Sequence, residues 1–249
     1  MTRERALTAR VTFAREQRFA AGVRIGAGSI VDDDVVLGAA GADADPPVIG
    51  ERAVIRRGSE VNSGVRAGDR LRTGRNVVIG EDTTLGDDCA IGHNSVVGSG
   101  CTIGDRVRID ANCVIAALTT IEDDVRVAAG VNVANDPHPG SGTQLCSRGP
   151  TLRRNAQIGA GSTIWPFVEV GEAALVEPGS VVTESVAAGV VVMGNPARVH
   201  GAVMDVRCPL DLPEGGYLTR PASPPLVDRE RAQPRDRGPS RARSSSGCT

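Results

Sequence analysis

An aliphatic residue recurs at every sixth position over a long central stretch of this sequence, and no other feature constrains the fold as strongly. Glycine often follows the aliphatic residue, and the fifth residue of each block is usually small. A short fixed period of this kind is typical of a repeat architecture rather than of a single globular core. The aliphatic residues that open the blocks are Ile79, Leu85, Ile91, Val97, Ile103, Ile109, Ile115, Ile121, Val127 and Val133.

Six-residue blocks predict a parallel β-helix, in which each block is a short strand plus a turn and three blocks make one triangular coil. The aliphatic side chains point into the prism and stack on their equivalents in neighbouring coils, at a strand spacing of roughly 4.8 Å. Glycine takes the corners, where a Cβ has little room. A β-sandwich would instead alternate with period two, with turn residues every 8–12 positions or so. We therefore expect an all-β solenoid.

The repeat divides the chain into segments. We expect a cap over residues 1–22, the β-helix over 23–193, a short C-terminal segment over 194–221 and a disordered tail over 222–249. Two interruptions, at 41–47 and 134–151, predict loops that protrude from the column. After the second loop the repeat resumes at Leu152 with its phase moved by one residue.

The composition suits a narrow column. Aromatic residues make up only 2% of the chain, because the interior of a thin prism has room only for small and aliphatic side chains. A net charge of −2 favours neither nucleic acid nor a membrane as partner. No apolar run is long enough for a signal peptide or a membrane span, so we expect a cytoplasmic protein. Cys89, Cys101 and Cys113 hold the small fifth position, which predicts buried thiols rather than disulfides.

Three stretches together resemble a known family: the hexapeptide run, the loop NDPHPG at 135–140 and the closing TESVAAGVVVMGNPARV at 183–199. They look like the left-handed β-helix acyltransferases, and most similar to the nucleotide-sugar N-acetyltransferases. The resemblance implies a left-handed coil, a homotrimer, and acetyl-CoA or another acyl-CoA bound between neighbouring columns. It also implies transfer to an amino group of a nucleotide-linked deoxyaminosugar, with no metal. Threefold packing is a closed symmetry that suits the flat faces of a prism.

Amide formation from a thioester needs a base for the amine proton and donors for the oxyanion. His138 is the candidate base, because the flanking prolines stiffen its loop and an unperturbed imidazole has a pKa near 6.5. Asp136 would orient that imidazole or, with Asn135, hold the substrate ammonium. The alternatives are a loop histidine with no role and a pair of turn-initiating residues. We expect His93, at an outward position, to face solvent or another subunit.

The resemblance implies further site residues. Asn112 lies where related enzymes use asparagine near the substrate amine, although asparagine is also common at corner turns. Arg75 would face the sugar diphosphate, at a position where relatives often carry histidine. Arg198 would reach the phosphates of CoA, for which a guanidinium is well suited. The implied backbone contacts of the pantetheine arm are Ala160, Gly161, Pro178 and Gly179.

Other functions remain to be weighed. A γ-class carbonic anhydrase needs three histidines around a metal, two of them close in sequence, and His93, His138 and His200 are too far apart. O-acetylation of a sugar or serine, or N-acylation of an amino acid, would use the same column and CoA groove. A non-catalytic interaction solenoid is the alternative of another class, and the GNPAR motif and the loop histidine argue against it.

Overall fold

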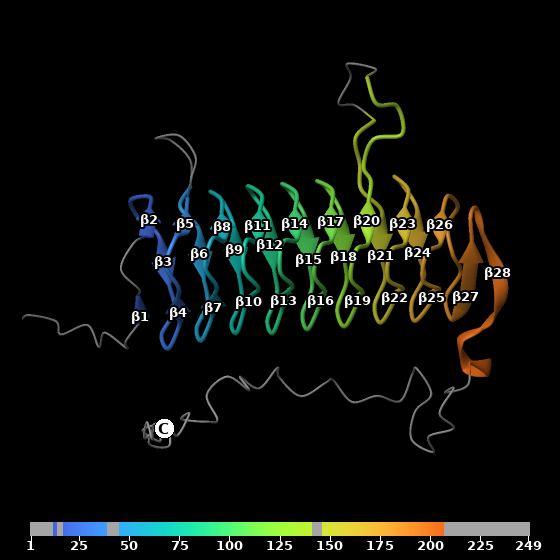
Figure 1. The fold of residues 1–249 in the computed structure, drawn as a ribbon, viewed down its shortest axis with the longest axis horizontal. Coiled ribbons are helices and arrows are strands. Elements are labelled where there is room, and N and C mark those ends of the chain that lie inside the picture. Colours follow the sequence, from blue (N-terminus) through green and yellow to red (C-terminus); the bar gives the residue numbers. More distant parts are fainter. Residues whose placement is uncertain (1–11, 14–16, 39–44, 141–145, 207–249) are drawn as a thin grey trace, which may run out of the picture.

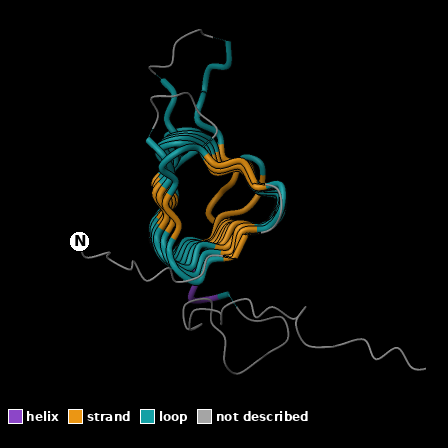
Figure 2. The backbone as a smooth tube through the Cα atoms, turned by 90° about the vertical axis from the view of Figure 1, so that its left-hand side faces the viewer, coloured by secondary structure: helices purple, strands orange, loops and turns teal. Residues whose placement is uncertain are grey.

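The computed structural model describes residues 12–13, 17–38, 45–140 and 146–206, which form one column of stacked coils (Figure 1). Seen along its axis, the column is triangular, with strands on its three sides and turns at its three edges (Figure 2). All strand pairs are parallel except the last, between β27 and β28. The prediction of an all-β hexapeptide solenoid is confirmed, and the column is consistent with a left-handed β-helix.

Each side of the column is one sheet. We name these sheets A, B and C, in the order in which the chain visits them, and give their strands in the order of pairing. Sheet A has 11 strands: β1 (Thr12–Phe13), β4 (Ile30–Val31), β7 (Val54–Ile55), β10 (Arg72–Thr73), β13 (Ala90–Ile91), β16 (Arg108–Ile109), β19 (Arg126–Val127), β22 (Gln157–Ile158), β25 (Leu175–Val176), β27 (Val190–Gly194) and β28 (Ala197–Ala202).

Sheets B and C are built in the same way. Sheet B has 9 strands: β2 (Gln17–Phe19), β5 (Val35–Leu37), β8 (Glu60–Val61), β11 (Val78–Ile79), β14 (Val96–Val97), β17 (Val114–Ile115), β20 (Asn132–Val133), β23 (Thr163–Ile164) and β26 (Val181–Val182). Sheet C has 8 strands: β3 (Arg24–Ile25), β6 (Val48–Ile49), β9 (Arg66–Ala67), β12 (Thr84–Leu85), β15 (Thr102–Ile103), β18 (Thr120–Ile121), β21 (Thr151–Leu152) and β24 (Glu169–Val170).

The register follows from the six-residue period. Three blocks make one coil, so a residue normally pairs with the residue 18 positions further on, as Thr102 does with Thr120. The spacing grows to 24 between Arg24 and Val48 and to 31 between Thr120 and Thr151. These two longer coils contain the two predicted loops. Each of these coils passes from sheet B to sheet C at its loop, from β5 to β6 and from β20 to β21, and the described part of the second loop protrudes there (Figure 1).

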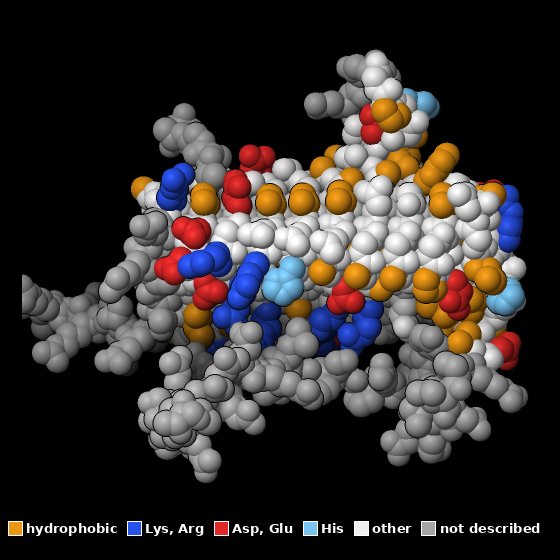
Figure 3. Space-filling view, in the orientation of Figure 1, with side chains coloured by type: hydrophobic (Ala, Val, Ile, Leu, Met, Phe, Trp, Pro, Cys, Tyr) orange, Lys and Arg blue, Asp and Glu red, His pale blue; other side chains and the backbone are white. Residues whose placement is uncertain are grey.

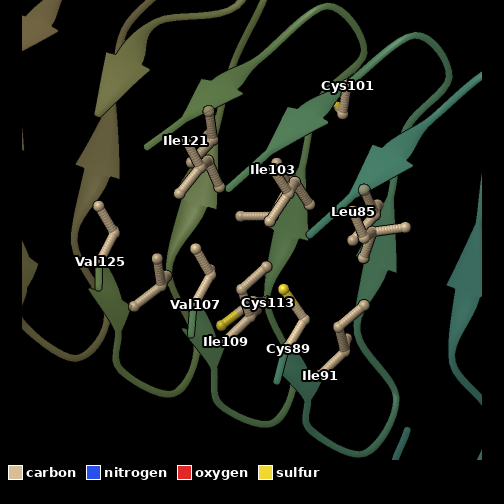
Figure 4. Packing of buried hydrophobic residues seen from close by; sticks show 14 of the residues in the cluster. Leu85, Cys89, Ile91, Cys101, Ile103, Val107, Ile109, Cys113, Ile121 and Val125 are labelled. Atoms are coloured by element: carbon tan, nitrogen blue, oxygen red, sulfur yellow. The ribbon is translucent and has the colours of Figure 1, made fainter. Parts of the chain in front are cut away.

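The interior holds the aliphatic residue and the small residue of each block. Ile79, Ile115 and Leu152 are at most 1% exposed. The hydroxyls and thiols at the small position bond to carbonyls of the next coil, as Ser95 Oγ does to Asp110 O at 2.8 Å. Within the described residues, no buried polar side-chain atom lacks a partner. The predicted burial of Cys89, Cys101 and Cys113 is confirmed (Figure 4).

Close packing at the edges explains the recurring glycine. A Cβ added to Gly80 would lie 2.5 Å from the backbone nitrogen of Ser99 in the next coil, so even alanine is excluded there. At the C-terminal end, β27 and β28 form an antiparallel hairpin that ends the parallel stack. The 3₁₀ turn η1 (Val203–Asp205) follows, and Val203 packs on Leu175 and Val191.

Replacing the inward residue of a strand should cost far more stability than replacing its outward neighbour. We expect Ile103→Ala to lower the free energy of unfolding by about 2–5 kcal/mol, because Ile103 is 3% exposed and its truncation leaves a cavity. Thr102→Ala, on the exposed face of the same strand, should change it by less than about 1 kcal/mol. Urea denaturation of both variants measures the difference, and equal losses would contradict the assigned inward and outward faces.

Two predicted segments lie partly or wholly outside the described residues. Of the expected cap over 1–22, the structure describes 12–13 and 17–22, where β1 and β2 pair with β4 and β5. The tail over 222–249 and most of the segment 194–221 are outside the description. In the part of the chain that is described, no helix has the length and apolar character needed to cross a membrane.

Candidate functional site

The turns that lead from sheet A to sheet B form one edge of the column, which we call the A–B edge. In its N-terminal half these turns carry Asn76, Asn94 and Asn112 in the left-handed conformation, with φ of 56°, 57° and 59°. The Asn76 amide donates to Asn94 Oδ1 at 3.1 Å, and the Asn94 amide donates to Asn112 Oδ1 at 3.3 Å. Asn112, predicted to lie near the substrate amine, thus also belongs to a structural ladder of amides.

In the C-terminal half of the A–B edge, glycine takes the turn position that asparagine holds in the N-terminal half. Gly161 and Gly179 take the left-handed turn position, with φ of 68° and 72°, and a Cβ on either would meet nothing within 4 Å. Space is therefore open on the outer side of both turns. The residues predicted to contact the pantetheine arm, Ala160, Gly161, Pro178 and Gly179, all lie on this exposed part of the edge.

His93 lies on the same edge, one coil before Asn112. Its Nδ1 accepts a hydrogen bond from the backbone N–H of Arg75 at 2.8 Å. A neutral imidazole held in this way carries its proton on Nε2. His93 lines a hollow of about 530 Å³ on sheet A, together with Arg72, Ala90 and Arg108. His93 is exposed, as expected, and it lies beside the larger of the two hollows on sheet A.

Sheet A carries both concave regions side by side. The second has a volume of about 430 Å³ and is lined by Arg108, Arg126 and Glu177, and also by Ala160 and Pro178 of the A–B edge. Arg108 borders both hollows. Basic side chains gather on the lower half of the visible face (Figure 3). The two hollows thus adjoin at Arg108, and their basic side chains could hold an anionic ligand.

The loop that carries His138 lies at a different edge, between sheets B and C. The two ends of this loop are joined by a hydrogen bond, which the Arg148 backbone N–H donates to Asn135 O at 2.8 Å. Asp136 Oδ1 accepts the backbone N–H of His138 at 2.7 Å, so this carboxylate stabilises a turn of the loop. The His138 side chain is exposed. Asn135, Asp136 and His138 are close to one another, as predicted from the sequence.

Within one chain, the predicted residues fall into separate groups. Asn112 and the predicted CoA contacts share the A–B edge, whereas His138 is on the far side of sheet B. Arg75 lines a shallow hollow with Asp32, Asp33 and Arg57, nearer the N-terminal end than the hollows on sheet A. Arg198 is exposed on β28, and its nearest carboxylate is Glu184 at 3.8 Å.

Sheet B, between the two groups, exposes an apolar surface. Val78, Val96 and Val114 pair in consecutive strands and point outward, with Val96 38% and Val114 47% exposed. Figure 3 shows this row along the upper half of the column. Leu118 and Phe167 add to it on either side of the loop, with φ of 60° and 61°. Bulky residues rarely adopt this left-handed backbone conformation, and here the side chains of both residues are exposed to solvent.

The described residues show no constellation for metal or thiol chemistry. No group of three His, Cys, Asp or Glu side chains is arranged to hold a metal ion in this part of the chain. Burial raises the pKa of the Cys89 thiol to about 12 and shifts the pKa of Cys101 and Cys113 in the same direction. These thiols therefore belong to the core and remain protonated at neutral pH.

Comparison with known proteins shows what the repeat is. A family profile described as bacterial transferase hexapeptide matches residues 100–135, and one described as hexapeptide repeat of succinyl-transferase matches residues 82–117. Residues 82–135 of the column therefore match transferase hexapeptide repeats. A putative serine acetyltransferase of Schizosaccharomyces pombe is 44% identical over 57 residues. That match covers 23% of this chain and 21% of the yeast protein, so the chain spans about a fifth of its curated relative.

Solved structures extend the likeness to most of the hexapeptide column. A UDP-N-acetylglucosamine acyltransferase from Campylobacter jejuni has a TM-score of 0.55 at 18% identity, over 78% of this chain and 73% of the other. A Bacteroides fragilis protein of the same description has a TM-score of 0.59 at 15% identity, over 76% and 74%. At this identity the likeness shows the fold. The predicted resemblance to the hexapeptide-repeat acyltransferases is confirmed for the repeat and for the fold.

Proposed function

We propose that this protein is an acyl-CoA-dependent N-acyltransferase that uses acetyl-CoA and acylates an amino group of a nucleotide-linked deoxyaminosugar. One observation carries the proposal. The A–B edge aligns His93 and Asn112 with the open turns at Gly161 and Gly179, beside the basic hollows of sheet A. Three coils separate His93 from Ala160, which is roughly 14 Å at the usual strand spacing. A thioester arm on the open turns would end near the polar part of the edge.

The active site in this proposal lies between copies of the chain. Sheet B lies between the edge with the CoA contacts and the edge with the His138 loop. Packing sheet B against a neighbour would cover Val96 and Val114 and bring one copy's loop toward another copy's A–B edge. A homotrimer closes such contacts into a ring without leaving an unpaired face. Neither edge alone carries all the predicted groups.

In the proposed reaction, the main task of the protein is to position the amine next to the thioester. The substrate amine attacks the thioester carbon, so a C–N bond forms and the C–S bond breaks. In this proposal His138 accepts the amine proton and returns it to the departing thiolate. Asn112 and backbone N–H groups of the edge donate to the oxyanion. Arg198, at the C-terminal end, would pair with phosphates of CoA, as Arg75 would with those of the acceptor.

A panel assay tests the proposed reaction. We expect release of free thiol when the protein is incubated with acetyl-CoA and a UDP- or dTDP-linked aminosugar, and mass spectrometry of the sugar should show one added acetyl group. The matching sugars with a hydroxyl in place of the amine serve as controls. Acetylation of the hydroxyl sugars instead would indicate O-acetyl transfer. No thiol release with any acceptor, together with no acetyl-CoA binding in a calorimetric titration, would favour a non-catalytic solenoid.

Serine is the second acceptor to include in the panel. The likeness to a putative serine acetyltransferase favours it, at 44% identity over 57 residues. Those repeats form the scaffold common to both candidate reactions, so the acceptor must be decided by the residues that face the hollows. If serine is turned over faster than every aminosugar, serine becomes the proposed acceptor. The proposed binding of CoA at the A–B edge is then unchanged.

A further inference from the structure

Three arginines on sheet A form no ion pair with any described residue, although Asp88 and Asp124 lie close enough to interact with Arg108 and Arg126. Arg72, Arg108 and Arg126 point outward from β10, β16 and β19, and no described carboxylate lies within ion-pair distance of them. Arg108 and Arg126 are directly paired in neighbouring strands, so their side chains start roughly 4.8 Å apart. Arg72 is two strands from Arg108, and the small side chain of Ala90 lies between them. We call these three residues the arginine row.

Two arginines at another edge of the column are each paired with a carboxylate. Along the edge between sheets C and A, Arg70 binds both carboxylate oxygens of Asp88, at 2.6 and 2.8 Å, and Arg106 binds Asp124 in the same way, at 2.8 Å. These hydrogen bonds lower the pKa of both carboxyl groups. Arg70 and Arg106 are thus each paired with a carboxylate. The arginine row, in contrast, forms no ion pair and lines the hollows.

The arginine row also carries an electrostatic cost. Like charges opposite one another in neighbouring strands destabilise a sheet. Partial burial, with the charges of Arg126 and Arg72 nearby, lowers the pKa of Arg108. Asp110 and Glu177 line the same hollows and Asp88 lies near Arg108, but none forms an ion pair with the row. A bound anion with two adjacent charged groups would therefore offset the repulsion between these guanidinium groups.

We propose that the arginine row binds the diphosphate of a substrate, with one phosphate between Arg108 and Arg126 and the other turned toward Arg72 and Ala90. Planar guanidinium groups suit phosphate oxygens because they donate two parallel hydrogen bonds. His93 borders the same hollow and has Nε2–H as a further donor. The identity of the ligand rests on the proposed function, since both a nucleotide sugar and CoA carry a diphosphate. That an anion binds at the arginine row does not depend on the proposed function.

Calorimetric titration of the full-length protein with UDP, CoA and inorganic pyrophosphate tests this site. We expect the double substitution Arg108→Gln/Arg126→Gln to weaken binding of pyrophosphate about tenfold or more, and each single substitution to weaken it less. Binding by the unmodified protein should also weaken as salt is raised. Arg66→Gln is the matched control, because Arg66 holds the same outward strand position on sheet C. Circular dichroism verifies that each variant is folded.

The nucleotide titrations identify the ligand. Loss of UDP affinity in the double variant would assign the row to the acceptor, and loss of CoA affinity would assign it to the acyl donor. The proposal is overturned if the unmodified protein binds none of the three probes, or if the folded double variant binds them all as tightly. Pyrophosphate binding that depends on Arg108 would stand even if no acyl transfer were found, so the two proposals fail separately.

Discussion

His138→Ala is expected to lower kcat for acyl transfer by about 10²–10⁴, with little change in KM for either substrate. A general base contributes an effect of this size when it removes a proton in the transition state. The loop holds His138 in an exposed turn fixed by Asp136 Oδ1 and by the closure at Asn135. Steady-state kinetics with acetyl-CoA and the best acceptor of the panel measure the effect.

His93 provides the decisive comparison. Its Nδ1 is occupied by the backbone of Arg75 and it borders the larger hollow, so we expect His93→Ala mainly to raise KM for the acceptor. His200→Ala, on exposed β28, is the control and should leave both parameters unchanged. If His93→Ala instead lowers kcat by 10² or more while His138→Ala does not, the role of base belongs to His93. Full activity in both variants would point to proton transfer within the substrates.

Val114→Glu should dissociate the protein into single chains. Val114 is 47% exposed in the apolar row of sheet B, and in the proposed trimer it would be buried at each of the identical interfaces. An unpaired carboxylate in such a place costs several kcal/mol, and each 1.4 kcal/mol weakens association about tenfold. The association constant should therefore fall by about 10³ or more. Because the proposed site uses two copies, activity should fall with it.

Sedimentation and light scattering measure the assembly directly. Thr102→Glu is the matched control, because Thr102 is exposed at the same strand position on sheet C, away from the apolar row. This control should remain a trimer with unchanged activity. A single-chain state in the unmodified protein, or a Val114→Glu variant that still forms trimers, would contradict an interface on sheet B.

Much of the column could be predicted from the period alone. A residue such as Ile103 had to face inward and Thr102 outward, because any other register would expose the aliphatic set. The phase change at Leu152 predicted a loop before it, and Thr120 pairs with Thr151, 31 positions further on. The arginine row was not predicted, although the sequence contains its signal. Arg72, Arg108 and Arg126 are separated by whole multiples of the 18-residue coil, a spacing that places them in line on one sheet.

The environment of single side chains could not be predicted in this way. For Asp136 the sequence left open whether it orients the imidazole of His138, holds the substrate or initiates a turn, and its carboxylate accepts a hydrogen bond from the loop backbone. Asn112 belongs to an amide ladder that only the stacking of three coils creates. His93 was expected to face solvent or a subunit, and its bond to Arg75 depends on a turn one coil away.

The sequence by itself determined the column: which residues fill it, where its coils are interrupted and how many residues each interruption adds. It could do so because every coil repeats the same local contacts, so a period of six is enough to specify the register. Only the tertiary structure decided which edge each functional group occupies. Residues 18 or 31 positions apart become neighbours only when the coils stack, and their hydrogen bonds and unpaired charges follow from that stacking.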